Sequence, residues 1–138
     1  MSTYQKARQN LVRAFHKYIK LRDPYCVTCQ YMIRHELIGN KKYTPEPFPS
    51  IHASHYISCG NEGTRYDERN VHGQCAPCHI IYGGKKAGIY KLFMLETYGQ
   101  ELLDELVLLG NTQPRRSEAW LKEQAQIYRD KNRRLINA

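Results

Sequence analysis

The sequence predicts an α+β fold in which a small core holds a four-cysteine zinc site and helices flank the core at both ends. Two observations support this prediction. Helical apolar patterns occur at the N-terminus and through the C-terminal half, and two Cys-x-x-Cys pairs enclose the turn-rich segments between them. The 138 residues fit one compact unit, in which we expect a core domain of residues 1–110 and a C-terminal basic helix in residues 111–138.

An amphipathic helix is predicted for residues 4–21, because apolar side chains recur there at helical spacing until Asp23-Pro24 ends the pattern. Residues 1–22 carry six basic and no acidic side chains, so this helix has a basic outer face. A basic face of this kind is suited to binding a polyanion, although a solvated helix face is the simpler interpretation of any single charged stretch.

The middle of the chain is predicted to contain short extended segments over residues 31–38 and 50–58. A turn follows at residues 59–63, where two glycines flank Asn61 and Glu62. Residues 65–71 then lead back to the second cysteine pair, at which a short helix can begin.

The C-terminal half is predicted to be helical. Two helices are expected over residues 87–98 and 100–109, with Gly99 and Gly110 as their stops. Ser117 can cap a last helix that runs to about Leu135.

The cysteine spacing predicts a structural zinc site. Cys26 and Cys29 form one pair and Cys75 and Cys78 the other, and each pair places two thiolates close enough to bind one ion. Four sulfurs complete the tetrahedral shell of zinc and leave no open position for chemistry. The fifth cysteine, Cys59, is expected to be a buried or idle thiol.

Charge and hydropathy restrict the partners. The net charge of +8 favours nucleic acid, and residues 115–134 add seven basic side chains against three acidic ones. We expect no membrane span, because the chain has no long apolar run, and its first residues lack the apolar stretch of a signal peptide. The protein is therefore expected in the cytoplasm, that of a host bacterium if a phage encodes it.

One motif resembles a nuclease centre. In the stretch Asn70-Val-His-Gly-Gln-Cys-Ala-Pro-Cys-His79, an asparagine lies nine residues before a histidine that follows the second cysteine pair, and His55 lies upstream. This arrangement resembles the zinc-containing His-Asn-His (HNH) nucleases of the ββα-metal class. The resemblance implies a core of two strands and a helix around one catalytic ion.

A wider set of motifs resembles the phage recombination endonucleases of the Rap (NinG) type. It comprises the string His52-Ala-Ser-His55-Tyr-Ile, the segment Arg65-Tyr-Asp-Glu-Arg-Asn-Val71, the dipeptide Gln74-Cys75 and the basic helix that precedes them. This resemblance implies an endonuclease that acts on branched recombination intermediates such as four-way (Holliday) junctions and D-loops.

The HNH resemblance also implies a role for each motif residue. His55 would be the general base that takes a proton from water, and Asn70 would fix the loop that carries the base. His79 would bind the catalytic ion, Mg²⁺ or Mn²⁺. The position before the base, where many members have a second ligand, is Ser54, a poor ligand for a hard cation. His52 and Asp67 are the alternatives for that second ligand.

DNA contacts are expected from the basic residues nearest this centre. These basic residues are Lys41, Lys42, Arg65, Arg69, Lys85 and Lys86. A homodimer is expected if a two-fold symmetric junction is cut symmetrically.

Three histidines are expected to lie outside the chemistry. His16 and His35 are predicted at the surface, and His72 is predicted to be structural or exposed. The sequence is also compatible with two other functions. One is a noncatalytic zinc-ribbon module that binds nucleic acid, and the other is a general HNH nuclease that nicks linear duplex.

Overall fold

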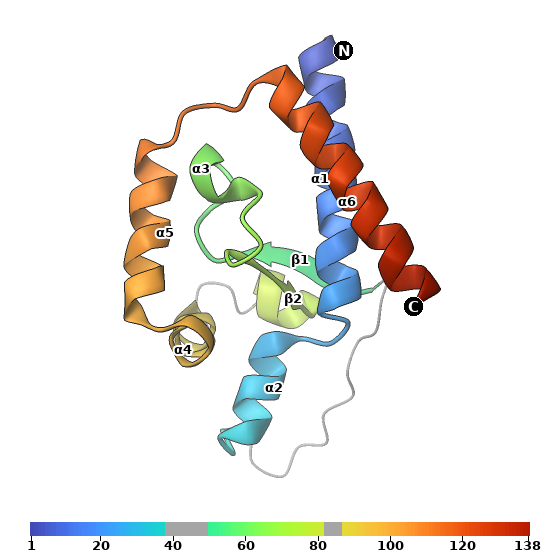
Figure 1. The fold of residues 1–138 in the computed structure, drawn as a ribbon. Helices are drawn as coiled ribbons and strands as arrows, with labels where there is room; N and C mark the ends of the chain where they lie inside the picture. The colour runs from blue at the N-terminus through green and yellow to red at the C-terminus, as the bar shows by residue number, and fades with distance from the viewer. Residues whose placement is uncertain (38–49, 82–86) are drawn as a thin grey trace.

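The computed structural model describes residues 1–37, 50–81 and 87–138, and within these ranges it combines α-helices with one small two-stranded sheet (Figure 1). The predicted α+β class is therefore confirmed at this level. The elements, in chain order, are α1 (Thr3–Arg22), α2 (Val27–Arg34), β1 (His52–His55), α3 (Glu62–Arg65), β2 (Val71–Gln74), the π-helical turn η1 (Pro77–Ile81), α4 (Ala87–Tyr98), α5 (Gln100–Thr112) and α6 (Glu118–Asn137).

The two strands form an antiparallel hairpin whose register fixes the two motif histidines. His52 lies opposite Gln74 and His55 lies opposite Val71, so the two histidines occupy opposite ends of β1. The turn η1 follows β2 after Cys75 and Ala76. The hairpin and this turn lie between α1 on one side and α4 and α5 on the other (Figure 1).

Helices α1 and α6 lie side by side and run in the same direction (Figure 1). Their shared core includes the fully buried Leu11, Phe15 and Leu121. Hydrogen bonds tie the pair at two places, because Tyr4 Oη donates to the Arg116 carbonyl at 2.9 Å near the start of both helices and Asn132 Nδ2 donates to the Ala14 carbonyl at 2.9 Å farther along. The C-terminal helix therefore belongs to the same hydrophobic cluster as the N-terminal one.

Both terminal helices were predicted, and their caps explain where they begin. Ser2 and Ser117 each accept a hydrogen bond from a backbone N–H of the first helical turn, from Gln5 at 3.1 Å and from Trp120 at 3.1 Å. Gln5 completes a capping box at α1 by accepting from the backbone N–H of Ser2.

The prediction of an extended segment over residues 31–38 was wrong for the described residues 31–37, because they begin inside α2 and continue into a turn. The Cys26 side chain caps α2 by accepting from Cys29 N at 3.4 Å, and Tyr31 is buried against the residues of α4. Packing on a neighbouring helix therefore overrides the β-propensity of Tyr31 and Ile33.

The two helices after residue 86 have the expected starts but not both expected stops. Gly99 ends α4 with a positive φ of 87°, a conformation that glycine adopts without strain. Gly110 lies inside α5, which continues to Thr112. Glycine at this position allows α3 to pack closely against α5, because a Cβ there would lie only 3.3 Å from Thr64 Oγ1 of α3.

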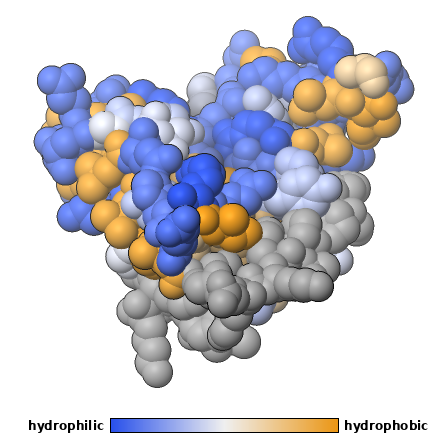
Figure 2. Space-filling view, turned by 90° about the horizontal axis from the view of Figure 1, so that it is seen from below, coloured by the Kyte–Doolittle hydropathy of each residue, from blue (hydrophilic) through white to orange (hydrophobic). Residues whose placement is uncertain are grey.

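The surface of the described residues is mainly hydrophilic where it faces the viewer in Figure 2, with smaller hydrophobic areas between. Among these residues, no helix has the length and apolar character that crossing a membrane requires.

Candidate functional site

The four cysteines of the two Cys-x-x-Cys pairs converge on one point. Their sulfurs lie within 4.8 Å of one another, and Cys29 Sγ lies 3.7 Å from Cys75 Sγ and 3.5 Å from Cys78 Sγ. A tetrahedral zinc ion with Zn–S bonds of about 2.3 Å separates its sulfurs by roughly 3.8 Å. The spacing in the protein therefore fits one structural zinc ion, as the sequence predicted.

Local backbone structure places each pair. Cys26 lies at the N-cap of α2 and Cys29 lies one turn later, whereas Cys75 directly follows β2. The Cys75 carbonyl accepts from His79 N at 2.9 Å, which closes the turn that contains Cys78. The two halves are also joined beside the sulfurs, since Gln74 Nε2 donates to Thr28 Oγ1 at 3.0 Å.

The sulfurs need a cation to become thiolates together. Burial, with the neighbouring sulfurs, raises the pKa of Cys75 to about 12. A bound divalent ion would displace these protons and thereby couple its binding to folding. Cys59 lies outside this cluster and is exposed, so of the two expected alternatives, a buried or an idle thiol, the structure favours the idle one.

Asn70 fixes the loop that follows β1. Its side chain is fully buried, and Oδ1 accepts from Ile57 N at 2.7 Å. Its Nδ2 donates to the carbonyls of Ile57 and Thr64, both at 3.0 Å. The backbone continues the link, because Tyr56 N donates to the Asn70 carbonyl at 2.8 Å. One side chain thus holds both ends of the segment from Ile57 to Thr64.

His55 lies at the end of β1, and this segment orients its ring. His55 Nε2 lies 2.9 Å from the carbonyl of Arg65, the residue after Thr64. Because a carbonyl can only accept, Nε2 carries the hydrogen and Nδ1 keeps its lone pair. Burial lowers the pKa of His55 below its usual value, and the charges of Arg65 and His79 lower it further. His55 is therefore a neutral imidazole at pH 7 with one nitrogen free to accept a proton.

His52 and His79 face each other at the other end of β1. Their Nδ1 atoms lie 3.1 Å apart, and partial desolvation together with His52 lowers the pKa of His79, although its side chain is still exposed to solvent. Two nitrogens bound to one ion at about 2.1 Å and a right angle lie roughly 3.0 Å apart. These two side chains could therefore hold one divalent ion between them.

Asp67, the other candidate for the second ligand, is engaged elsewhere. Its carboxylate accepts from the backbone N–H of Arg69 at 2.9 Å and from the Arg69 guanidinium at 3.0 and 2.7 Å. The geometry thus favours His52 beside His79.

Sequence reasoning missed His16. The prediction that it lies at the surface was wrong, because the residue is half-buried and its ring centroid lies 5.8 Å from that of His55. Burial, with the nearby charges of His55 and Lys20, lowers the pKa of His16 to about 4. The available signal was its place at the edge of the apolar stripe of α1, three residues before the buried Ile19.

The remaining histidines behave as expected. His72 is buried, with Nε2 2.7 Å from Tyr98 Oη and Nδ1 3.3 Å from Tyr90 Oη, which indicates a structural role. His35 is exposed and pairs with Glu96 at 2.6 Å.

The predicted DNA contacts divide into three groups. Arg65 lies beside the histidines, since its charge lowers the pKa values of both His16 and His55. Arg69 is engaged in ion pairs with Asp67 at 2.7 Å and Glu105 at 3.5 Å. The others lie outside the described residues. These are Lys41, Lys42, Lys85 and Lys86.

Comparison with known proteins identifies a family. The model of a family described as Bacteriophage Lambda NinG protein matches residues 1–137, which is nearly the whole chain. No curated protein and no solved structure matches it.

Proposed function

Since the chain belongs to the bacteriophage lambda NinG family, we propose that it is a structure-specific DNA endonuclease with an HNH centre, and that it cuts branched recombination intermediates such as four-way junctions and D-loops. The four-cysteine cluster is the structural zinc site of this enzyme. The histidines at the two ends of β1 and at η1 form the catalytic centre.

One observation carries the proposal most strongly, namely the buried amide of Asn70. Its three hydrogen bonds hold the segment whose next carbonyl, that of Arg65, orients His55. A noncatalytic zinc module needs the cysteines, but it has no need of a neutral imidazole held in one tautomer with its second nitrogen free. A general base requires both of these features.

In the proposed reaction, His55 Nδ1 takes a proton from a water molecule while the water oxygen attacks the phosphorus. The bond between the phosphorus and the 3′ oxygen breaks, and the bonding electron pair stays on that oxygen. A Mg²⁺ or Mn²⁺ ion held by His79 and His52 would supply stabilisation of the charge on the phosphate and the leaving oxygen. General-base assistance of this kind contributes roughly 10²–10⁴ in rate.

The charge of the chain supports DNA as the substrate. The net charge of +8 favours a polyanion, and the basic helix α1 supplies His16 and Lys20 beside His55. Branch specificity rests on the family resemblance. A homodimer would match the two-fold symmetry of a four-way junction.

The decisive experiment compares the cleavage of an end-labelled four-way junction, a D-loop and a linear duplex of matched sequence, each with Mg²⁺ or Mn²⁺. The His55→Ala variant should bind the junction and keep its zinc while its cleavage rate falls by about 10²–10⁴. The matched control is His35→Ala, which removes an exposed imidazole and should cut like the wild type.

Three results would contradict the proposal in different ways. Cleavage retained by His55→Ala would rule out His55 as the base. Equal cutting of linear duplex would indicate a general HNH nuclease. Binding of all three substrates without cutting would indicate a noncatalytic zinc-ribbon module.

A further inference from the structure

The groove between α1 and α6 is lined by cations that the catalytic centre does not use. Its volume is about 590 Å³, and Arg13 and Lys17 contribute from α1 while Arg129 and Arg133 contribute from α6. All four side chains are exposed. None of the described residues that line this groove is acidic.

The cations form two facing rows. Arg13 and Lys17 are four residues apart on α1, as are Arg129 and Arg133 on α6, and four residues advance an α-helix by about 6 Å. The floor between the rows is fixed, because Asn132 Nδ2 donates to the Ala14 carbonyl at 2.9 Å and both residues are buried. Two parallel rows on a fixed floor suit an extended polyanion better than a single small anion.

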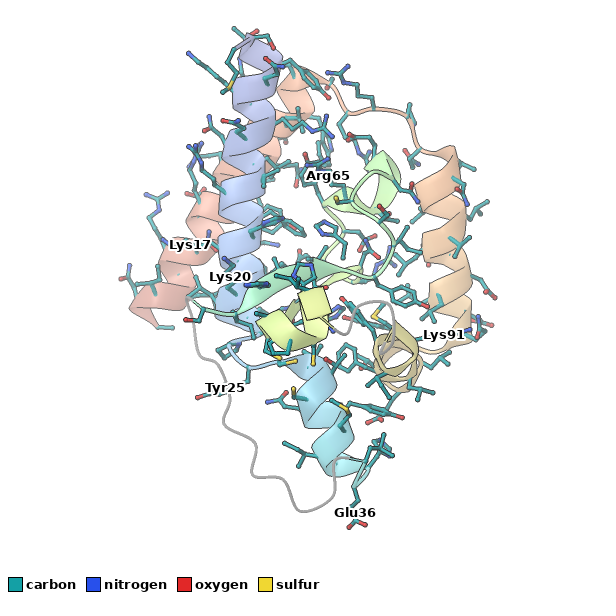
Figure 3. The ribbon with its side chains drawn as sticks, turned by 180° about the vertical axis from the view of Figure 1, so that it is seen from behind. Lys17, Lys20, Tyr25, Glu36, Arg65 and Lys91 are labelled. Atoms are coloured by element: carbon teal, nitrogen blue, oxygen red, sulfur yellow. The ribbon has the colours of Figure 1, made fainter. Side chains whose placement is uncertain are left out.

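The groove is separated from the catalytic histidines by α1 itself. Lys17 lies on the side of α1 that faces α6, whereas Lys20 lies nearer to β1 (Figure 3). An α-helix with its side chains is about 10 Å wide. A phosphate in the groove is therefore a different phosphate from the one beside His55.

We propose that the α1–α6 groove, defined by Arg13, Lys17, Arg129 and Arg133, is a second DNA site that binds the sugar-phosphate backbone away from the cut. This inference rests on the proposed function for the identity of its ligand. The groove contacts phosphates without reading bases, and it holds the substrate in register while His55 acts on another part of the same molecule.

The salt dependence of binding tests the groove directly. Each phosphate that a cation neutralises contributes about 0.9 to the slope of log K against log salt for duplex DNA. The double variant Lys17→Gln/Arg129→Gln should therefore lower the magnitude of that slope by about 1.8 for a four-way junction. Binding is measured by fluorescence anisotropy between low and moderate salt, without added Mg²⁺ or Mn²⁺, so that no cutting occurs.

The matched control is Arg34→Gln/Lys91→Gln, which removes the same charge from exposed positions on α2 and α4. It should leave the slope at the wild-type value. A second groove variant, Arg13→Gln/Arg133→Gln, should also lower the magnitude of the slope, but by less than the first variant, because Arg133 already pairs with Asp130 on α6. The thermal unfolding of each variant verifies that it is folded.

The possible results separate this inference from the proposed function. A slope that stays at the wild-type value in both folded groove variants overturns the second site, even if the wild type cuts junctions. A wild type that binds but never cuts overturns the endonuclease, and the slope of the groove variants still decides the second site.

Discussion

Replacing Asn70 by alanine removes the side chain that ties together the segment behind the proposed base. Three hydrogen bonds are lost, and three backbone groups lose their partner, two of them on the half-buried Ile57 and one on the buried Thr64. At about 1 kcal/mol for each bond, and more where a buried group stays unsatisfied, the free energy of unfolding should fall by about 3–5 kcal/mol. For a chain of this length, such a loss lowers Tm by roughly 10–15 °C.

The same substitution should also lower the cleavage rate at temperatures where the variant is folded. Asn70 holds the Thr64 carbonyl, and the next carbonyl, that of Arg65, orients His55. A displacement of about 1 Å in a reacting group costs roughly 10²-fold in rate, and we expect a loss of that size in junction cleavage.

The control is Asn111→Ala, which removes an exposed asparagine side chain that makes one hydrogen bond to the Val107 carbonyl. It should change Tm by no more than a degree or two, because surface substitutions usually stay within about 0.5 kcal/mol. Thermal unfolding and junction cleavage are measured on both variants. An Asn70→Ala protein with the Tm and cleavage rate of the control would refute the role assigned to this amide.

Two further predictions concern the zinc site and the buried His72. Cys75→Ser should lose bound zinc, measured by elemental analysis, and should unfold at lower temperature, because structural zinc contributes directly to folding. The control Cys59→Ser alters an exposed thiol outside the cluster and should change neither the zinc content nor the unfolding temperature. His72 is neutral when folded because burial lowers its pKa to about 4, so it contributes stability above pH 6.5 that is lost as the pH falls toward 4. Between pH 7 and pH 5, the free energy of unfolding of the wild type should therefore fall by about 2 kcal/mol more than that of His72→Gln. Urea unfolding at the two pH values measures both decreases, and equal decreases in the two proteins would contradict this assignment.

Much of the helical architecture was predictable because its signals are local. Ser2 and Ser117 cap the terminal helices, and the apolar stripe between Tyr4 and Ile19 has the period of a helix. The error at residues 31–38 arose because Tyr31 and Ile33 favour strands locally, whereas a thiol cap and burial against α4 decide in favour of a helix. Neither of these causes can be read from the composition of the segment.

The four clustered cysteines were predictable because Cys-x-x-Cys spacing places two sulfurs one turn of backbone apart, close enough to bind one ion. His16 could not be found in the same way, since its neighbour His55 lies 39 residues along the chain, and only the packing of α1 on the hairpin brings the two rings together. The preference for His52 over Asp67 likewise depends on contacts across the fold, because His79 lies on η1 and Arg69 takes up the Asp67 carboxylate.

The hairpin links the zinc site and the buried amide of Asn70 to different halves of the proposed chemistry. Asn70 precedes β2 and Cys75 follows it, while the antiparallel register sets His55 opposite Val71 and His52 opposite Gln74. The base therefore lies at the Asn70 end, and the two proposed ion ligands, His52 and His79, lie at the cysteine end. Loss of zinc should consequently weaken the binding of the catalytic ion before it disturbs the tautomer of His55, whereas loss of the Asn70 amide should do the reverse.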